Sequence, residues 1–231
     1  DTTVTNHKGK THRLQAKLTG LNGKKALIRD EKAALAAKTL ILQSKFAVSD
    51  VNHAEKQKYP QPPFTTSSLQ QEASRKLNFS TGKTMQVVQT LYEGVDVGHG
   101  TVGLVTYIRT DSVRVSDEAL TAVREMIRDT YGAEYCPPRP NVYKGRKNAQ
   151  DAHEAIRPTD LALTPETVKK SLSRDQYNLY KLIYTRFVAC QMKPAVFETV
   201  TIDIHGTPEN DDKHSADLRY YGEHMTFAGY R

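Results

Sequence analysis

The sequence predicts an α+β protein in which a helical domain is inserted into a discontinuous β-rich domain. Polar and apolar residues alternate with the period of a strand near both ends of the chain, whereas signals that start and stop helices occupy its centre. The proline-rich stretch at residues 59–63 separates the first alternating region from the helical centre. We therefore assign residues 1–60 and 193–231 to the β-rich domain and residues 61–192 to the helical domain.

The N-terminal part of the β-rich domain is expected to contain two strands and one helix. Residues 11–18 alternate as a strand does. Alanines dominate residues 30–42, and Asp30 and Glu31 suit the first helical turn, because carboxylates are stabilised by the positive end of the helix dipole. Residues 45–58 alternate again and predict a second, longer strand.

The helices of the central domain are predicted mainly from their capping residues. Ser67 and Gln70 match a capping box, and Ser173 and Gln176 match a second one. Gly132 is typical of the residue that follows the last turn of a helix. The expected helices cover residues 67–77, residues 82–92, residues 116–132, a segment that starts at residue 164, and residues 173–192.

The strand pattern returns after the helical centre and is incomplete at both ends of the chain. Residues 197–204 alternate and predict a strand, and the acidic group at residues 209–212 is typical of a polar turn. The first residues begin, and the last residues stop, within such a pattern. We therefore expect this chain to be a central part of a longer protein.

The composition favours a polyanionic partner and excludes several other classes of protein. The 231 residues carry a formal net charge of +7 and a pI near 9.3, which favour binding to a nucleic acid. Cys136 and Cys190 are far apart in the sequence, so neither a disulfide framework nor a zinc site is predicted. No apolar run is long enough to span a bilayer, and we expect no membrane partner.

The most informative segment is residues 103–112, which we call the tyrosine block. Residues 102–107 alternate like a strand, so Tyr107 and Arg109 are expected to project from the same face. A guanidinium can hold a phosphodiester through two hydrogen bonds, and its charge favours a nearby phenolate. The pair could therefore be a nucleophile and its phosphate-binding partner. On spacing alone, a packed strand tyrosine beside a solvated arginine is the more common arrangement.

Three blocks of sequence resemble one family. The tyrosine block resembles the active-site segment of type IA DNA topoisomerases, the bacterial topoisomerase I family. Residues 148–159, the histidine block, and residues 62–73, the proline block, resemble segments of the same family. The resemblance implies a β-rich arch interrupted by a helical domain that carries the nucleophile. In that family Tyr107 would attack a phosphodiester and become linked to the 5′ phosphate.

The resemblance also implies catalytic roles for Arg109 and His153. Arg109 would hold the scissile phosphate and stabilise its developing charge, and the alternative is a surface ion pair with Asp111. His153 could bind the phosphate or help to move a proton, and the alternative is a histidine held structurally by Asp151 or Glu154. Other polar residues of these blocks are expected to support the site or contact DNA: Thr106, Thr110, Asp111, Ser112 and Arg157.

Arg157 is expected to share a face with His153 if their segment is helical. Residues 144–147 are predicted to be a basic loop that could contact the DNA backbone, although a solvated turn is an equal alternative.

The resemblance places one requirement of the chemistry outside this chain. The family positions a divalent metal on an acidic cluster in a separate N-terminal domain, whereas no Asp-x-Asp pair occurs in these residues. The resemblance thus implies Mg²⁺ in the full-length enzyme, no metal bound by this chain, and no cleavage by this chain alone. The implied partners are DNA, especially single-stranded DNA, and the missing N-terminal domain of the same protein. A cytoplasmic, nucleoid-associated enzyme is expected.

Two other classes of function stay open at this point. A DNA-binding module without chemistry would also be basic, and a different tyrosine-linked strand transferase would also need a tyrosine and an arginine. A covalent 5′ phosphotyrosine would indicate the topoisomerase, a 3′ linkage would indicate the strand transferase, and no linkage would indicate the DNA-binding module. The sequence does not distinguish topoisomerase I, topoisomerase III and reverse gyrase as the parent protein.

Overall fold

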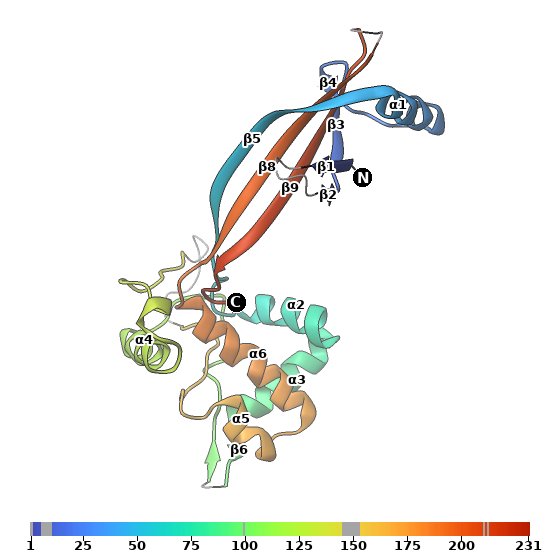
Figure 1. The fold of residues 1–231 in the computed structure, drawn as a ribbon. Helices are drawn as coiled ribbons and strands as arrows, with labels where there is room; N and C mark the ends of the chain where they lie inside the picture. The colour runs from blue at the N-terminus through green and yellow to red at the C-terminus, as the bar shows by residue number, and fades with distance from the viewer. Residues whose placement is uncertain (1, 6–10, 99, 145–152, 210, 212) are drawn as a thin grey trace. The chain divides into compact units, whose positions relative to one another are not determined.

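The computed structural model describes residues 2–5, 11–98, 100–144, 153–209, 211 and 213–231. The chain divides into two compact units (Figure 1). The β-rich unit consists of residues 1–57 and 196–227, and the helical unit consists of residues 58–195 and 228–231. Residues 228–231 were predicted in the β-rich domain but group with the helical unit, where the Tyr230 N–H donates to the Lys193 carbonyl at 3.1 Å.

The β-rich unit is built on one five-stranded sheet. Its strand order is β4-β3-β9-β8-β5, and Figure 1 shows the three longest strands running side by side. β8 pairs antiparallel with β9 from Val196 opposite Phe227 to Gly206 opposite Ala216. The strands of this sheet are β3 (Lys17–Leu21), β4 (Lys24–Lys25), β5 (Ser44–Lys58), β8 (Ala195–Pro208) and β9 (Ala216–Phe227).

Most secondary-structure predictions for the β-rich unit are confirmed, and one is wrong. The predicted helix is α1 (Glu31–Gln43), in which the Asp30 carboxylate accepts a hydrogen bond from the Ala33 N–H at 2.8 Å. The single strand predicted over residues 11–18 is wrong. It breaks into β2 (Thr11–Leu14), which pairs with β1 (Thr2–Thr5), and β3, which pairs with β9. Alternation continues through the break, so the pattern could not show that the two halves join different sheets.

The helical unit contains the predicted helices in the predicted order. One cap was assigned wrongly: Thr65, not Ser67, caps α2, and its side chain accepts from the Ser68 N–H. The Ser173–Gln176 capping box of α6 is confirmed. The elements are α2 (Thr66–Leu77), α3 (Thr81–Glu93), β6 (Val95–Asp96), β7 (Thr101–Val102), α4 (Asp117–Tyr131), α5 (Pro165–Val168) and α6 (Arg174–Cys190), with 3₁₀ turns at Ala133–Tyr135 and Lys169–Ser171.

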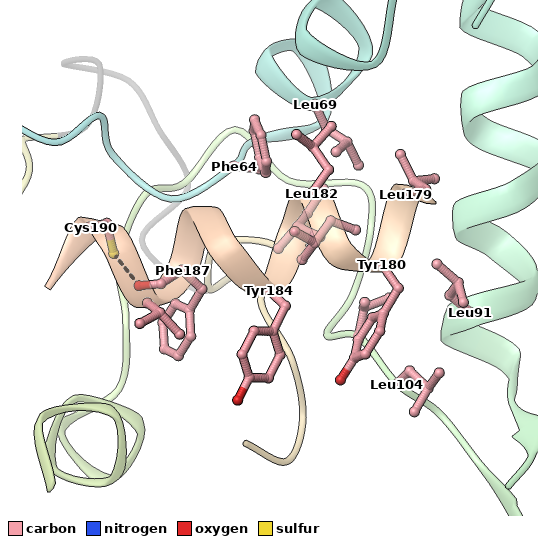
Figure 2. Close-up of a cluster of buried hydrophobic side chains, with 14 of the residues drawn as sticks. Phe64, Leu69, Leu91, Leu104, Leu179, Tyr180, Leu182, Tyr184, Phe187 and Cys190 are labelled. Atoms are coloured by element: carbon pink, nitrogen blue, oxygen red, sulfur yellow. Dashed lines mark hydrogen bonds between the residues drawn. The ribbon is translucent and has the colours of Figure 1, made fainter. Parts of the chain in front are cut away.

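Helix α6 forms the centre of the helical core. Figure 2 shows its side chains packing with Leu69 of α2 and Leu91 of α3, all within one buried cluster. Two buried tyrosines on α6 satisfy their hydroxyls by donating to carbonyls: Tyr180 to Leu163 at 2.6 Å and Tyr184 to Leu161 at 2.8 Å. These bonds avoid the cost of burying an unpaired hydroxyl and also hold the loop before α5.

Two expectations from composition can be compared with this fold. Cys136 and Cys190 are both buried free thiols. Among the helices of the described residues, none combines the length and the apolar character that a membrane span requires.

Candidate active site

The backbone of the tyrosine block is irregular, so the strand predicted over residues 102–107 is wrong. Regular pairing stops at Val102, and the only later strand-like contact in the block is a bridge between Val105 and Pro158. The argument that Tyr107 and Arg109 share the face of a strand is therefore wrong. The reason is tertiary: the block hydrogen-bonds to several separate segments in place of one neighbouring strand.

Thr106 attaches the tyrosine block to the histidine block. Its N–H donates to the Arg157 carbonyl at 2.9 Å, and its hydroxyl donates to the Ala155 carbonyl at 2.8 Å. The same hydroxyl accepts from the Arg157 N–H at 3.0 Å. One residue before Tyr107 is thus fixed by three hydrogen bonds, which explains why a threonine is suited to this position.

Thr66 attaches the other side of the tyrosine block to the proline block. It is the first residue of α2, and its hydroxyl donates to the Ile108 carbonyl at 2.6 Å while accepting from the Thr110 N–H at 2.9 Å. Its own N–H donates to the Thr110 carbonyl at 2.9 Å. Thr66 was not among the predicted site residues, although it lies within the proline block. The structure thus joins all three blocks around Tyr107.

The Tyr107 side chain lies at the surface between these two attachments. It is 42% exposed, whereas its neighbour Ile108 is buried. Its ring lies 5.3 Å from the ring of His153, with 36° between the planes, and 5.9 Å from the ring of Tyr92, nearly edge-on at 69°. The structure therefore brings Tyr107 and His153 together as predicted candidates, and it adds Tyr92. Tyr92 was recognised in the sequence only as the end of a predicted helix.

The polar residues after Tyr107 divide into exposed and buried side chains. Arg109 and Asp111 are exposed. Thr110 and Ser112 are buried and hold the turn: the Thr110 hydroxyl accepts from the Ser112 N–H at 3.0 Å, and the Ser112 hydroxyl accepts from the Arg114 N–H at 3.1 Å. Arg109 forms no ion pair, and no ring contact with Tyr107, within the described residues.

Arg157 is engaged by protein groups. It donates from Nε and Nη2 to Glu154 at 3.0 and 2.7 Å, and from Nη1 to the Pro158 carbonyl at 2.9 Å. Burial raises the pKa of Glu154, but hydrogen bonds from Ser116 and Arg157 outweigh burial and hold this pKa below its usual value. Residues 153–157 are not helical, so the condition for a shared helix face between Arg157 and His153 is not met.

Three predictions from the sequence concern the partner of His153, the basic loop and a metal site. Asp151, one alternative partner for His153, and most of the basic loop after Lys144 lie outside the described residues. Among the described residues, no three His, Cys, Asp or Glu side chains gather in a way that could hold a metal ion. The described part of the chain therefore offers no ligand set for a magnesium ion.

Comparisons with known proteins define the family. The family model described as DNA topoisomerase matches residues 3–231. DNA topoisomerase 1 of Rickettsia prowazekii (strain Madrid E) is 47% identical over 194 residues, which cover 82% of this chain and 25% of that protein. DNA topoisomerase 1 of Xylella fastidiosa (strain Temecula1) is 48% identical over 197 residues, which cover 82% of this chain and 24% of that protein.

A solved structure agrees with this assignment. Full-length topoisomerase I of Thermotoga maritima matches with a TM-score of 0.73 and 36% identity, covering 94% of this chain and 33% of that one. The protein is therefore of the type IA DNA topoisomerase class. The chain belongs to the bacterial DNA topoisomerase I family, and it spans about a quarter of the length of the curated relatives it matches.

Proposed function

We propose that this chain carries the strand-cleaving tyrosine of a type IA DNA topoisomerase and that Tyr107 is the nucleophile. The observation that carries the proposal is an exposed phenol on a fixed backbone. Thr106 and Thr66 hold the chain on either side of Tyr107, and the ring of His153 lies 5.3 Å from the Tyr107 ring. Such fixed positioning of an accessible nucleophile is what covalent catalysis requires.

The proposed chemistry is a reversible transesterification. The Tyr107 Oη attacks the phosphorus of one phosphodiester, and the bond from phosphorus to the 3′ oxygen breaks. The phenol proton leaves with attack, and the 3′ oxygen takes up a proton as it departs. The DNA then carries a 5′ phosphotyrosine at one end and a free 3′ hydroxyl at the other. Because the ester bond is exchanged without hydrolysis, the reverse attack reseals the strand.

Arg109 and His153 are proposed to act on the phosphate. The exposed residue Arg109 can bind the non-bridging oxygens through its guanidinium and stabilise the charge that develops during attack. The His153 ring, partly buried beside Tyr107, can donate a hydrogen bond to the same phosphate or accept the phenol proton. Arg157, bound to Glu154, is assigned to holding the histidine block, with Thr106, Thr110 and Ser112 holding the backbone. Asp111 is exposed and is left as a DNA-proximal residue.

We define the full-length enzyme as a protein of the relatives' length that carries this chain. We propose that the full-length enzyme cleaves one strand of negatively supercoiled DNA, passes another strand through the gap, and reseals the cleaved strand. Single-stranded DNA is the proposed partner, with Mg²⁺ bound by acidic residues of another domain. The β-rich unit is proposed as the hinge for strand passage. Action on chromosomal DNA implies a nucleoid location in the cytoplasm.

Tyr107→Phe in the full-length enzyme tests the nucleophile. It removes one exposed hydroxyl, so the fold should persist, whereas relaxation and the covalent adduct should both disappear. The adduct is trapped by denaturing the enzyme with a single-stranded oligonucleotide labelled at either end. A 5′ phosphotyrosine in wild type and none in the variant is expected. Relaxation by the folded variant would remove Tyr107 from the proposal.

The same assay distinguishes the alternative functions. A 3′ linkage would indicate a different strand transferase, and wild-type binding without any adduct would indicate a DNA-binding module. We expect the 231-residue chain alone to bind single-stranded DNA with strong salt dependence and to form no adduct, even with magnesium. An adduct formed by this chain alone would show that the missing acidic residues are not needed for cleavage.

A further inference from the structure

Tyr92 is the second ring in contact with Tyr107, and it comes from a different element. It lies in the last turn of α3, and its ring meets the Tyr107 ring nearly edge-on, with 5.9 Å between the centroids. The two rings are 38% and 42% exposed, so neither is part of the core. The contact therefore joins two surface side chains beside the proposed reacting atom.

The backbone around Tyr92 is fixed by unusually close packing. After α3 the chain turns at Gly94, whose φ of 128° is unfavourable for other residues, and returns through the β6–β7 hairpin. A Cβ atom at Gly103 would lie only 2.6 Å from the Tyr92 carbonyl oxygen. Next to it, the Leu104 N–H donates to the Leu91 carbonyl at 2.7 Å. The end of α3 is thus attached directly to the start of the tyrosine block.

Tyr107 itself lacks the restraint that regular structure gives a side chain. Its segment is irregular, and Thr106 and Ile108 restrain the backbone and not the ring. An exposed tyrosine can occupy several χ1 wells, and only some of them place its oxygen in line with a phosphate. Edge-to-face contact favours one relative orientation of two aromatic rings. Within the described residues, Tyr92 and His153 are the rings that contact Tyr107 and can select its orientation.

We propose that Tyr92 is a positioning residue for the nucleophile: its ring holds Tyr107 in the orientation required for attack. The inference rests on the proposed role of Tyr107. The ring, and not the hydroxyl, is the active part, because the Tyr92 hydroxyl has no hydrogen bond within the described residues. Tyr92 touches neither phosphate nor the reacting atoms in this role, so it acts only through Tyr107.

The test compares Tyr92→Leu with Tyr92→Phe in the full-length enzyme. The leucine keeps apolar bulk at the helix end but removes the aromatic edge, whereas the phenylalanine keeps the ring. We expect Tyr92→Leu to lower the single-turnover rate of adduct formation about three- to tenfold, as loss of one edge-to-face contact predicts. Tyr92→Phe should cleave within about twofold of wild type. Oligonucleotide affinity and melting temperature should be unchanged in both.

Tyr131→Leu is the matched control. Tyr131 also lies in the last turn of a helix before a glycine, is 48% exposed, and has no ring contact with Tyr107 within the described residues. The Tyr131→Leu enzyme should form the covalent adduct at the wild-type rate. Tyr92→Met provides a second non-aromatic variant if Tyr92→Leu lowers the melting temperature, and the slow cleavage should reappear in it.

The outcomes separate this inference from the proposed function. Wild-type cleavage by folded Tyr92→Leu and Tyr92→Met, with Tyr107→Phe inactive, would overturn the role of Tyr92 and leave the nucleophile intact. Equal losses in Tyr92→Phe and Tyr92→Leu would also overturn it, because the hydroxyl would then matter. Cleavage by Tyr107→Phe would remove the basis of both proposals.

Discussion

The helical unit is built around a buried core, whereas the β-rich unit is a long sheet with few buried side chains. α6 alone buries residues such as Leu179, Ile183 and Phe187. By contrast, no residue of the fifteen-residue strand β5 is fully buried, and α1 buries only Ala37. At one point of the sheet an aromatic side chain packs against the backbone of a neighbouring strand. The Phe46 ring lies over Gly206, and a Cβ atom at Gly206 would be only 2.3 Å from this ring.

This difference matches the demands that the proposed function makes on each unit. Attack on phosphorus requires side chains fixed to within a fraction of an ångström, and a close-packed core supplies that rigidity. A hinge must bend without losing large amounts of buried apolar area, and a thin sheet held by ladder hydrogen bonds can do so. Substitutions of similar residues in both units test this difference.

The largest expected effect is the removal of a core leucine. Leu179→Ala on α6 deletes a fully buried side chain and should lower the free energy of unfolding of the helical unit by about 2–5 kcal/mol. Leu35→Ala on α1 of the β-rich unit removes the same atoms from a side chain that is 56% exposed, and should cost at most about 0.5 kcal/mol. Denaturant unfolding followed by circular dichroism at the helix band measures both. Equal losses would contradict the difference in burial between the two leucines.

The second effect concerns arginines. Arg109→Ala in the full-length enzyme should reduce the cleavage rate roughly a hundredfold or more, because it removes charge stabilisation at one phosphate, whereas oligonucleotide affinity should change only a few-fold. Arg219→Ala on β9 breaks an exposed pair with Asp203 at 2.6 Å and should leave both quantities near wild type. Single-turnover cleavage and oligonucleotide titration measure them. If affinity collapses while relaxation survives, Arg109 is a general DNA contact.

The features that sequence predicted well are local ones. Asp30 and Ser173 cap helices within three or four residues of themselves, so their neighbours in the sequence contain the whole interaction. The cap of α2 was misplaced because four consecutive hydroxyl residues, 65–68, compete for it. Capping residues therefore predict the presence of a helix more reliably than they predict its first residue.

The geometry of the site depends on contacts that a single sequence does not display. Alternation around Tyr107 predicted a strand, but Thr66 and Thr106 draw the backbone toward two other segments. Gly103 permits the chain to approach the Tyr92 carbonyl closely, and the Tyr92 ring contacts the Tyr107 ring. The types of the site residues were predicted from the blocks, and their arrangement required the tertiary fold.

The smallest effect contrasts two carboxylates in acid. Glu72 on α2 is largely covered and binds Arg75 and Lys76 of its own helix and Arg186 of α6. Burial raises its pKa, but the hydrogen bonds of Arg75 and Lys76 and the charges of Lys76 and Arg186 outweigh burial, so the pKa lies below its usual 4.5.

A carboxylate whose pKa is lowered by folding stabilises the fold fully above its unfolded pKa, and the contribution is lost as the pH falls through the lowered folded pKa. Glu72→Gln should therefore be less stable than wild type by about 1–2 kcal/mol at neutral pH, and the gap should close as the pH falls below 4.5. Asp203→Asn in the β-rich unit should show no resolvable change in melting temperature at any pH, because water screens the exposed Asp203–Arg219 pair. Melting temperatures from pH 3 to pH 7, in steps of roughly half a unit, measure both variants against wild type. A gap for Glu72→Gln that persists unchanged in acid would show that its contribution comes from packing rather than charge.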